Sequence, residues 1–281
     1  MIYVGTCGFA YKDWIGPFYP GKIRSNEMLP YYARCFPAVE IDSSYYGVPQ
    51  PQTIARMDKV TPPEFRFCFK APATVTHPPD ASSAHIHPDA ALFVESVLPL
   101  KEAGKLGCAL LQFPNGFRKT AATESYLEQA VTALAPLPLV AEFRNREWQT
   151  DDTLRLLSEL GVGWCNVDMP SYDTLLKASS DVTSRLGYVR FHGRNAGQWW
   201  TGDNVTRYDY EYSPEELEPW TARTAEIEEA AGTTFAFFNN HARGSAARNA
   251  ELFIELLRSR YGNAAGIVAR REGVPAQGTL F

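Results

Sequence analysis

The sequence predicts a single (β/α)8 barrel. Two observations lead to this prediction: eight short runs rich in β-branched and aromatic residues recur along the 281-residue chain, and helix-like segments lie between most of them. Most of the runs are apolar almost throughout, as parallel strands must be when both faces of the sheet are covered. Barrels of about 250 residues are routinely single domains. We therefore assign residues 1–270 to the barrel and residues 271–281 to a C-terminal tail.

The expected strands and helices alternate along the chain. The strand-like runs comprise residues 2–9, 38–46, 65–72, 108–114, 139–145, 161–170, 187–193 and 234–240. Segments with apolar residues at helical spacing, or with helix-capping signals, comprise residues 89–106, 120–137, 150–161, 213–232 and 244–262. Ser213 and Glu216 form a capping-box pattern, and Gly161 ends its segment as a C-terminal cap would. The connection over residues 171–185 has the weakest helical pattern.

A doubly wound open sheet is the alternative architecture. Such folds carry a glycine-rich phosphate-binding turn after the first strand. Here the first run leads into "GTCGFAY", which is not GxGxxG, and no Walker sequence occurs. The barrel is therefore favoured.

Composition excludes several classes of protein. The formal net charge of −5 argues against a broadly basic surface for duplex nucleic acid. The start "MIYVGTCGFAYKDW" has no basic and apolar leader, and no run approaches the roughly 20 apolar residues of a membrane span, so we expect a cytoplasmic protein. The five cysteines form no CxxC pair and are expected to be buried and free.

Polar side chains gather at the ends of the strand-like runs. These residues are Thr6, Glu40, Asp42, Lys70, Gln112, Glu142, Arg144, Asn166, Asp168, Arg190, His192 and Asn239. Buried charges are costly unless they are paired, and barrel enzymes place their active sites at this end of the strands. The pattern predicts a shared polar site, with a closed network of ion pairs that plugs the barrel as the alternative.

Several longer motifs resemble a known family. In order they are "VGTCGFAYKDWIGPFYP", "YYARCFPAVEIDSSYYGVP", "FRFCFKAP", "LLQFP", "VAEFRNREW", "YVRFHGR" and "FFNNHARGSAARNA". Together they look like the YecE-like family, a domain of unknown function, and the resemblance spans nearly the whole chain. It implies a TIM-type barrel but no reaction. It also implies that Cys7 and Asp42 stand where Ser and Asn are common.

One hypothesis for the site is metal-assisted hydrolysis or transfer at a phosphoryl or glycosyl centre. Glu142, Asp168 and His192 end three successive strand-like runs and could converge as oxygen and nitrogen ligands. Such a mixed set suits a divalent ion such as Mg, Mn or Zn. The alternative for His192 is a hydrogen bond to Glu142 or Asp168.

A second hypothesis needs no metal. Glu40 and Glu142 could be the paired carboxylates of a glycosidase. Lys70 could act as a base or a Schiff-base nucleophile, with an ion pair to Glu40 or Asp42 as its alternative role.

The cations point to the kind of substrate. Arg144 and Arg190 with Lys70 would hold an anion, since the guanidinium fork matches phosphate and carboxylate, or they would neutralise the nearby carboxylates. Residues expected to orient or stack on the ligand are Gln112, Asn239, Tyr46 and Trp148. We therefore expect an enzyme, a hydrolase or a transferase or lyase, that acts on an anionic phosphate-containing sugar, nucleotide or nucleic acid at the C-terminal face of the barrel.

The tail offers a function of another class. Gln277, Leu280 and Phe281 in "PAQGTLF" resemble the short peptide with which bacterial proteins bind the replication sliding clamp. Two apolar anchors on an extended peptide suit a groove on a partner, although docking on the barrel itself is equally compatible. The alternative function is therefore a non-catalytic protein recruited to the clamp.

Overall fold

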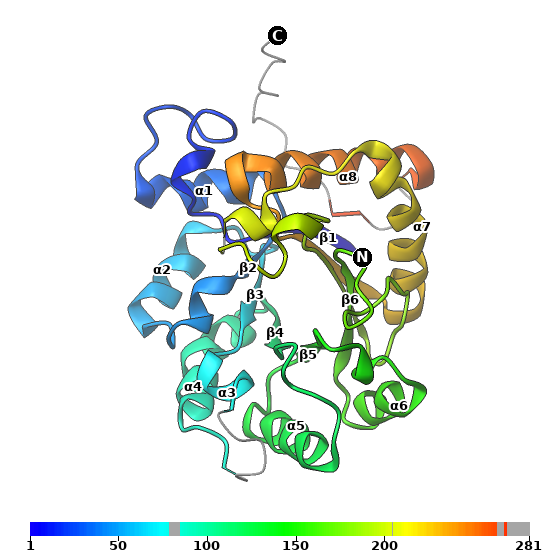
Figure 1. Ribbon diagram of the computed structural model, residues 1–281. Helices are drawn as coiled ribbons and strands as arrows, with labels where there is room; N and C mark the ends of the chain where they lie inside the picture. Colours follow the sequence, from blue (N-terminus) through cyan, green and yellow to red (C-terminus); the bar gives the residue numbers. More distant parts are fainter. Residues whose placement is uncertain (79–84, 204, 263–266, 269–281) are drawn as a thin grey trace.

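Eight parallel strands close into a barrel in the order of the sequence (Figure 1). The computed structural model describes residues 1–78, 85–203, 205–262 and 267–268. The strands are β1 Ile2–Cys7, β2 Ala38–Ile41, β3 Arg66–Lys70, β4 Leu106–Gln112, β5 Leu139–Glu142, β6 Gly163–Asp168, β7 Leu186–Phe191 and β8 Thr233–Phe238. The last strand pairs in parallel with the first, so the described barrel has no open edge. The predicted (β/α)8 fold and all eight strand-like runs are confirmed.

Helices surround the barrel (Figure 1). They are α1 Ser25–Cys35, α2 Pro51–Val60, α3 Ala73–Thr76, α4 Asp89–Glu102, α5 Ala121–Ala133, α6 Asp151–Glu159, α7 Pro214–Ala231 and α8 Ser245–Tyr261. The five helices expected from the sequence are present, each slightly shorter than its segment. The short α3 and the longer α1 and α2 were not expected. Pro30 lies inside α1, where proline is unfavourable, and so hides its helical pattern, whereas Pro51 stands at the first position of α2, which tolerates proline.

The capping signals act as the sequence indicates. The Glu216 backbone N–H donates to Ser213 Oγ, and the Glu216 carboxylate accepts from the Ser213 backbone N–H. Gly161 follows α6 with a φ of +69°, a conformation that glycine adopts without strain.

The connection between β6 and β7 contains no helix. Its chain runs against the barrel because Asn166 on β6 holds it there. The Asn166 Oδ1 atom accepts from Ser179 Oγ and from the Asp181 backbone N–H, and its Nδ2 atom donates to the Asp181 carbonyl. One polar side chain thus satisfies backbone groups that a helix would otherwise pair internally.

The residues beyond α8 are described only in part. Ile267 forms a bridge with Ile2, and the Val268 N–H donates to the Ile2 carbonyl. Residues 269–281 lie outside the described residues, and with them Gln277, Leu280 and Phe281. Clamp binding by the tail stays a prediction.

Burial agrees with the composition. All five cysteines are buried and free, as expected. In the described part of the chain, no helix combines the length and the apolar character needed to cross a membrane. The apolar core instead fills the barrel and the layer between strands and helices.

Gly5 on β1 is required by a close approach between strands and helix. A Cβ atom at Gly5 would lie 2.1 Å from the Ala38 carbonyl oxygen of β2. The hydroxyl of Tyr32, from α1, would lie 3.1 Å from the same Cβ atom; it accepts from the Thr6 backbone N–H and donates to the Ala38 carbonyl. A side chain here would therefore separate α1 from the β1–β2 pair.

We expect Gly5→Ala to lower the free energy of unfolding by about 3 kcal/mol, because a well-packed backbone must shift to admit a methyl group. Denaturant unfolding measures this. Gly21→Ala is the matched control, since nothing lies within 4 Å of the position that its methyl group would take. Equal stability of Gly5→Ala and the parent protein would contradict the packing argument.

Candidate functional site

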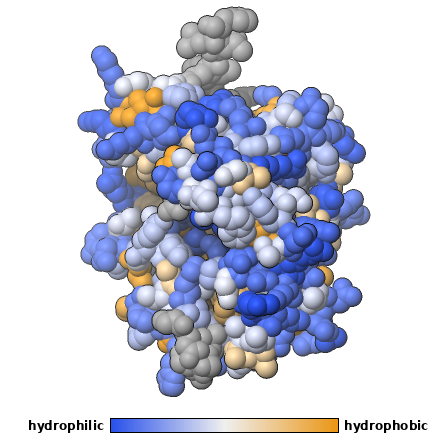
Figure 2. All heavy atoms as spheres, viewed as in Figure 1, coloured by the Kyte–Doolittle hydropathy of each residue, from blue (hydrophilic) through white to orange (hydrophobic). Residues whose placement is uncertain are grey.

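A cavity of about 750 Å³ opens at the C-terminal ends of the strands. Figure 2 shows the molecule in the view of Figure 1, with a mostly hydrophilic surface hollowed near its centre. The cavity is lined by Tyr11, Asp42, Ser43, Tyr45, Tyr46, Lys70, His77, Gln112, Pro114, Asn115, Arg144, Leu175, Arg190, Trp199, Trp200, Val205, Arg207, Tyr208, Asn239 and His241. Its walls come from strand ends and from the loops that follow them, as expected of a barrel site.

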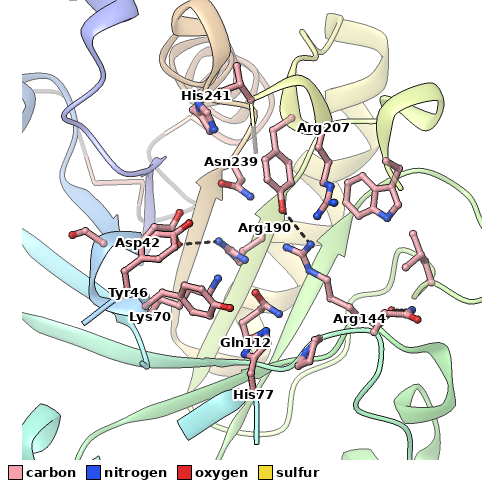
Figure 3. Close-up of a pocket in the computed structure, with 18 of the residues that line it drawn as sticks. Asp42, Tyr46, Lys70, His77, Gln112, Arg144, Arg190, Arg207, Asn239 and His241 are labelled. Atoms are coloured by element: carbon pink, nitrogen blue, oxygen red, sulfur yellow. Dashed lines mark hydrogen bonds and ion pairs between the residues drawn. The ribbon is translucent and has the colours of Figure 1, made fainter. Parts of the chain in front are cut away.

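The predicted site residues fall into three groups. Those that line the cavity are Tyr46, Lys70, Gln112, Arg144, Arg190 and Asn239. Glu40, Glu142 and His192 are fully buried and do not line it. Asp168 and Trp148 belong to other parts of the structure. In Figure 3, Asp42, Tyr46 and Lys70 lie on one side of the cavity, Arg144 and Arg207 on the other, and Arg190 between them.

Arg190 on β7 joins two carboxylates from distant strands. Its Nη1 atom donates to Glu142 Oε2 at 2.6 Å, and its Nη2 atom donates to Glu40 Oε1 at 2.6 Å. Asp42 Oδ1 lies 3.5 Å from the same Nη2 atom (Figure 3). Although burial opposes the charge, Glu142 and Glu40 raise the pKa of Arg190 well above its ordinary value. The guanidinium is therefore a permanent cation fixed by two carboxylates.

Glu142 on β5 serves three partners at once. Its Oε1 atom lies 3.1 Å from Arg144 Nε and 3.3 Å from His192 Nε2, while Oε2 accepts from Arg190. Burial would raise the pKa of Glu142, but Arg190, His192 and Arg144 together hold it well below its ordinary value. Glu142 is thus an ionised carboxylate covered by its partners. This placement fits an anchor for two arginines better than the leading acid or base predicted from the sequence.

His192 is a neutral ring held between two residues. Asn239 Nδ2 lies 3.0 Å from His192 Nδ1, so with this amide assignment Nδ1 accepts and the proton resides on Nε2, facing Glu142. Burial, opposed by Glu142, lowers the pKa of His192 to about 4. His192 therefore hydrogen-bonds Asn239, and its Nε2 atom lies 3.3 Å from Glu142 without a hydrogen bond of good geometry, so the expected hydrogen bond to Glu142 or Asp168 is not formed.

Glu40 differs from Glu142 in its ionisation. Burial raises the pKa of Glu40 to about 7, because Arg190 offsets only part of the lost hydration and Asp42 adds like charge. Tyr188 donates to Glu40 Oε2 at 2.6 Å. Glu40 and Glu142 are both held by the single guanidinium of Arg190, and neither lines the cavity. A glycosidase-like pair with direct access to a sugar is not formed.

Lys70 does not make the expected ion pair with Glu40 or Asp42. Its Nζ atom lies 4.1 Å from the centre of the Tyr45 ring, and within the described residues no carboxylate comes within ion-pair distance of it. Burial together with Arg190 and Arg144 lowers the pKa of Lys70, although Asp42 opposes this. Lys70 thus presents an amine with weakened proton affinity to the cavity.

Asp168 was expected to converge with Glu142 and His192, and this expectation is wrong. Its carboxylate faces away from the barrel interior and accepts from Arg194, Tyr212 and Trp220, with donor distances of 2.6–2.9 Å. The Cys165 side chain on the same strand points inward instead, with its Sγ atom 3.9 Å from Glu142 Oε2. Residues an odd number apart in a strand face opposite sides, so Asp168 supports the α7 side of the barrel.

The predicted metal set of Glu142, Asp168 and His192 is therefore not assembled. Among the described residues, ligand atoms of Cys7, Glu40 and Asp42 do lie within 4.8 Å of one another. Arg190 Nη2 contacts all three, at 2.6 Å from Glu40 and 3.5 Å from both Cys7 Sγ and Asp42 Oδ1. The guanidinium supplies the positive charge at the position that a metal ion would need.

Trp148 is also placed away from the cavity. It is fully buried, stacks on Phe143 and Phe117, and donates its indole N–H to the Phe117 carbonyl. Phe143 directly follows β5 and faces the helical layer. Trp148 stacks on Phe143 in that layer. The expected role of Trp148 in stacking on a ligand is wrong because its ring completes the packing outside the barrel.

Loops contribute residues that strand-end reasoning did not select. Arg207 and Tyr208 come from a turn inside the 193–212 connection, and Trp199 from the same connection covers Arg144 with its ring. His77 follows α3. The sequence signal for the residues of the 193–212 connection was its length, since long loops over a barrel mouth commonly carry function.

Comparison with known proteins places the chain in a family. Residues 3–274 match the family described as "Protein of unknown function DUF72". The chain belongs to this family. "UPF0759 protein YunF" of Bacillus subtilis is 32% identical, over 93% of this chain and 96% of that protein. "UPF0759 protein YecE" of Escherichia coli K12 is 32% identical over 42% of this chain and 39% of that protein.

Solved structures of the family share the barrel. The DUF72 family protein TM1631 of Thermotoga maritima superposes with a TM-score of 0.83 at 34% identity, covering 92% of this chain and 99% of that one. A DUF72 family protein of Enterococcus faecalis, EF0366, gives a TM-score of 0.80 at 29% identity, covering 92% of this chain and 96% of that one. The resemblance to the YecE-like family and the TIM-type fold are thereby confirmed. These relatives establish the fold and the family but name no reaction.

We expect Glu142→Gln to lower the free energy of unfolding at pH 7 by about 3–5 kcal/mol, because it leaves Arg190 and Arg144 buried without their shared carboxylate. The folded-state pKa of Glu142 is depressed, so its stabilisation is complete above the unfolded value of about 4.3 and is lost as the pH falls below it. Denaturant unfolding between neutral and acidic pH measures both effects.

Glu147→Gln is the matched control, since Glu147 forms a surface ion pair with Arg118. It should change stability little. Equal stability of Glu142→Gln and the parent protein at pH 7 would show that the two arginines do not depend on Glu142.

Proposed function

We propose that the cavity binds a small organic anion that carries a phosphate group, such as a sugar phosphate or a nucleotide. The observation that carries the proposal is the charge of the cavity wall. Four lysine and arginine side chains line it, Lys70, Arg144, Arg190 and Arg207, against one carboxylate, Asp42. The chain as a whole has a formal net charge of −5. Such a local excess of positive charge favours a negatively charged ligand.

Two of these cations, Arg207 and Lys70, carry donors without protein partners in the described residues. Within the described residues, Arg207 makes no ion pair, and its buried Nε atom has no hydrogen-bond partner. The Lys70 ammonium faces the Tyr45 ring rather than a carboxylate. Buried donors are normally satisfied, so these are available for ligand oxygens. The arginine fork suits the paired oxygens of phosphate.

Arg144 and Arg190 are already oriented for such a ligand. Glu142 holds one edge of each guanidinium, at 3.1 Å from Arg144 Nε and 2.6 Å from Arg190 Nη1. Fixing two guanidinium groups before binding reduces the conformational entropy lost when an anion arrives.

The rest of the wall suits an organic group attached to the phosphate. The rim carries Tyr46, which is 77% exposed, and Trp200, which is 50% exposed. Exposed aromatic faces stack on sugars or bases. Gln112 and Asn239 supply amide groups at the wall, and a volume of about 750 Å³ is in the usual range for small ligands.

The same cavity supports an enzyme of the hydrolase, transferase or lyase type. Its lining offers an amine of lowered pKa on Lys70 and a partly exposed carboxylate on Asp42. Either group could exchange a proton with, or in the case of Lys70 attack, a ligand held by the arginines. Glu40 and Glu142 contribute through Arg190 rather than by direct contact.

Calorimetric titration with paired ligands tests the proposal. Glucose 6-phosphate and adenosine monophosphate should bind at least tenfold more tightly than glucose and adenosine, because the phosphate meets the cationic wall. Binding should weaken as the salt concentration rises. If the neutral and the phosphorylated members of each pair bind equally, or if neither binds at millimolar concentration, the proposal is refuted.

Arg207→Gln should weaken phosphate-ester binding about tenfold, since a charge-assisted hydrogen bond contributes about 1.5 kcal/mol. Because Arg207 has no ion-pair partner in the described structure, the free energy of unfolding should stay within about 0.5 kcal/mol of the parent value. The control is Arg155→Gln on the surface of α6, which should change neither quantity appreciably. An unchanged affinity in Arg207→Gln would exclude Arg207 from the site.

A further inference from the structure

Tyr208 combines a partly buried position in the cavity wall with an unusual hydrogen-bond arrangement. It ends a short turn over residues Thr206–Tyr208 and lines the cavity. Its hydroxyl oxygen accepts from Arg144 Nη1 at 3.1 Å, the contact drawn as a dashed line from Arg144 in Figure 3. In the described part of the chain, no acceptor faces the proton of this hydroxyl. The proton is therefore free to meet a ligand in the cavity.

We propose that the Tyr208 hydroxyl is an acid–base group of the cavity, beside Lys70 and Asp42, and exchanges a proton directly with the bound ligand. This inference rests on the proposed anion-binding function and adds to it the residue that handles the proton. Tyr208 is one of many loop aromatics in the sequence, and its position beside Arg144 is visible only in the folded chain.

The charges around Tyr208 favour its ionised form. Burial on its own would raise the pKa of a phenol. Around Tyr208 the effect of burial is outweighed by Arg144, which also donates to the hydroxyl, and by Arg190 and Lys70, so that the pKa of Tyr208 is lowered. A phenolate next to a permanent guanidinium is a stabilised base, and the corresponding phenol is a more effective acid.

Two other tyrosines of the cavity, Tyr11 and Tyr45, lack this arrangement. The Tyr11 hydroxyl donates to the Cys7 carbonyl, and burial raises the pKa of Tyr11. The Tyr45 ring stacks under the Lys70 ammonium, and burial likewise raises the pKa of Tyr45. Neither hydroxyl accepts from an arginine in the described structure. Tyr45 therefore provides a matched control in the same cavity.

The proton transfer balances without any further reagent. The Tyr208 phenolate takes a proton from an O–H or C–H group of the ligand, the electron pair of that bond stays on the ligand, and the phenolate becomes a phenol. Arg144 and Arg190 stabilise the negative charge left on the ligand. When the phenol returns the proton to the product or to water, the phenolate is regenerated beside Arg144.

The first test is a spectrophotometric titration of the intact protein. Of the 14 tyrosines, one should ionise at lower pH than the rest, and this step should be absent in Tyr208→Phe. Tyr45→Phe should retain the step. A titration in which Tyr208→Phe and the parent protein show the same early step, or in which neither shows one, overturns the proposal. If Tyr208→Phe fails to fold, carbon-13 tyrosine resonances of the parent protein and of Tyr45→Phe decide whether one tyrosine ionises early.

The second test separates this inference from the proposed function. A bound anion raises the pKa of a neighbouring phenol, so glucose 6-phosphate binding should be accompanied by proton uptake where Tyr208 is partly ionised. Above about pH 8 the phosphate ester, with a second pKa of about 6, has no proton of its own to exchange. Calorimetry in buffers of different ionisation enthalpy counts the protons.

Tyr208→Phe should bind glucose 6-phosphate within threefold of the parent affinity but with less proton uptake, since only the part contributed by Lys70 remains, and Tyr45→Phe should keep the parent uptake. Parent-like uptake in Tyr208→Phe refutes the role of Tyr208 and leaves anion binding intact. If no anion binds while the early ionisation step is present, the proposed function fails and the proton-exchange role fails with it, although the lowered pKa of Tyr208 is upheld.

Discussion

The site depends on one buried guanidinium. Arg190 donates to Glu142 and Glu40 at 2.6 Å each, and these carboxylates come from strands on different sides of the barrel. A buried charge is tolerated only with such partners. Removing either carboxylate would therefore leave the Arg190 guanidinium without full compensation of its charge. Glu142 extends the network to Arg144 and His192. The orientation of the cavity wall therefore follows from contacts made beneath it.

The polar residues of the site form two layers with different roles. The lower layer contains Glu40, Glu142 and His192, which are fully buried and pair with one another through Arg190 and by direct contact. The upper layer presents Arg144, Arg190, Arg207 and Lys70 to the cavity. The two interpretations of the sequence, a closed ion-pair network and an anion-binding site, are thus compatible, because the network orients two of the cations that line the cavity.

The sequence was sufficient for the barrel and for much of the cavity wall, because strand periodicity and the position of strand ends determine both. It was insufficient where the role of a residue depends on which side of the sheet its side chain faces. Asn166 and Asp168 share a face of β6, but nothing in the sequence shows that this face meets the helices rather than the barrel interior. The sequence likewise does not show that Phe143 faces outward, and Trp148 stacks on Phe143 outside the barrel. Arg207 and Tyr208 lie in a loop without periodicity, so only the folded chain brings them to Arg144.

The ionisation of the lower layer links anion binding to pH. Burial and Asp42 raise the pKa of Glu40 to about 7, whereas Glu142 stays ionised well below neutrality. As the pH falls through 7, Glu40 takes up a proton and Arg190 loses one of the ionised carboxylates beside it, while Glu142 and Asp42 remain. The cavity wall then carries more uncompensated positive charge. At higher pH, loss of protons from Tyr208 and Lys70, whose pKa values are both lowered, reduces that charge again. Attraction for an anion should therefore weaken as the pH rises, first because Glu40 ionises beneath the cavity and then because Tyr208 and Lys70 lose their protons on its wall.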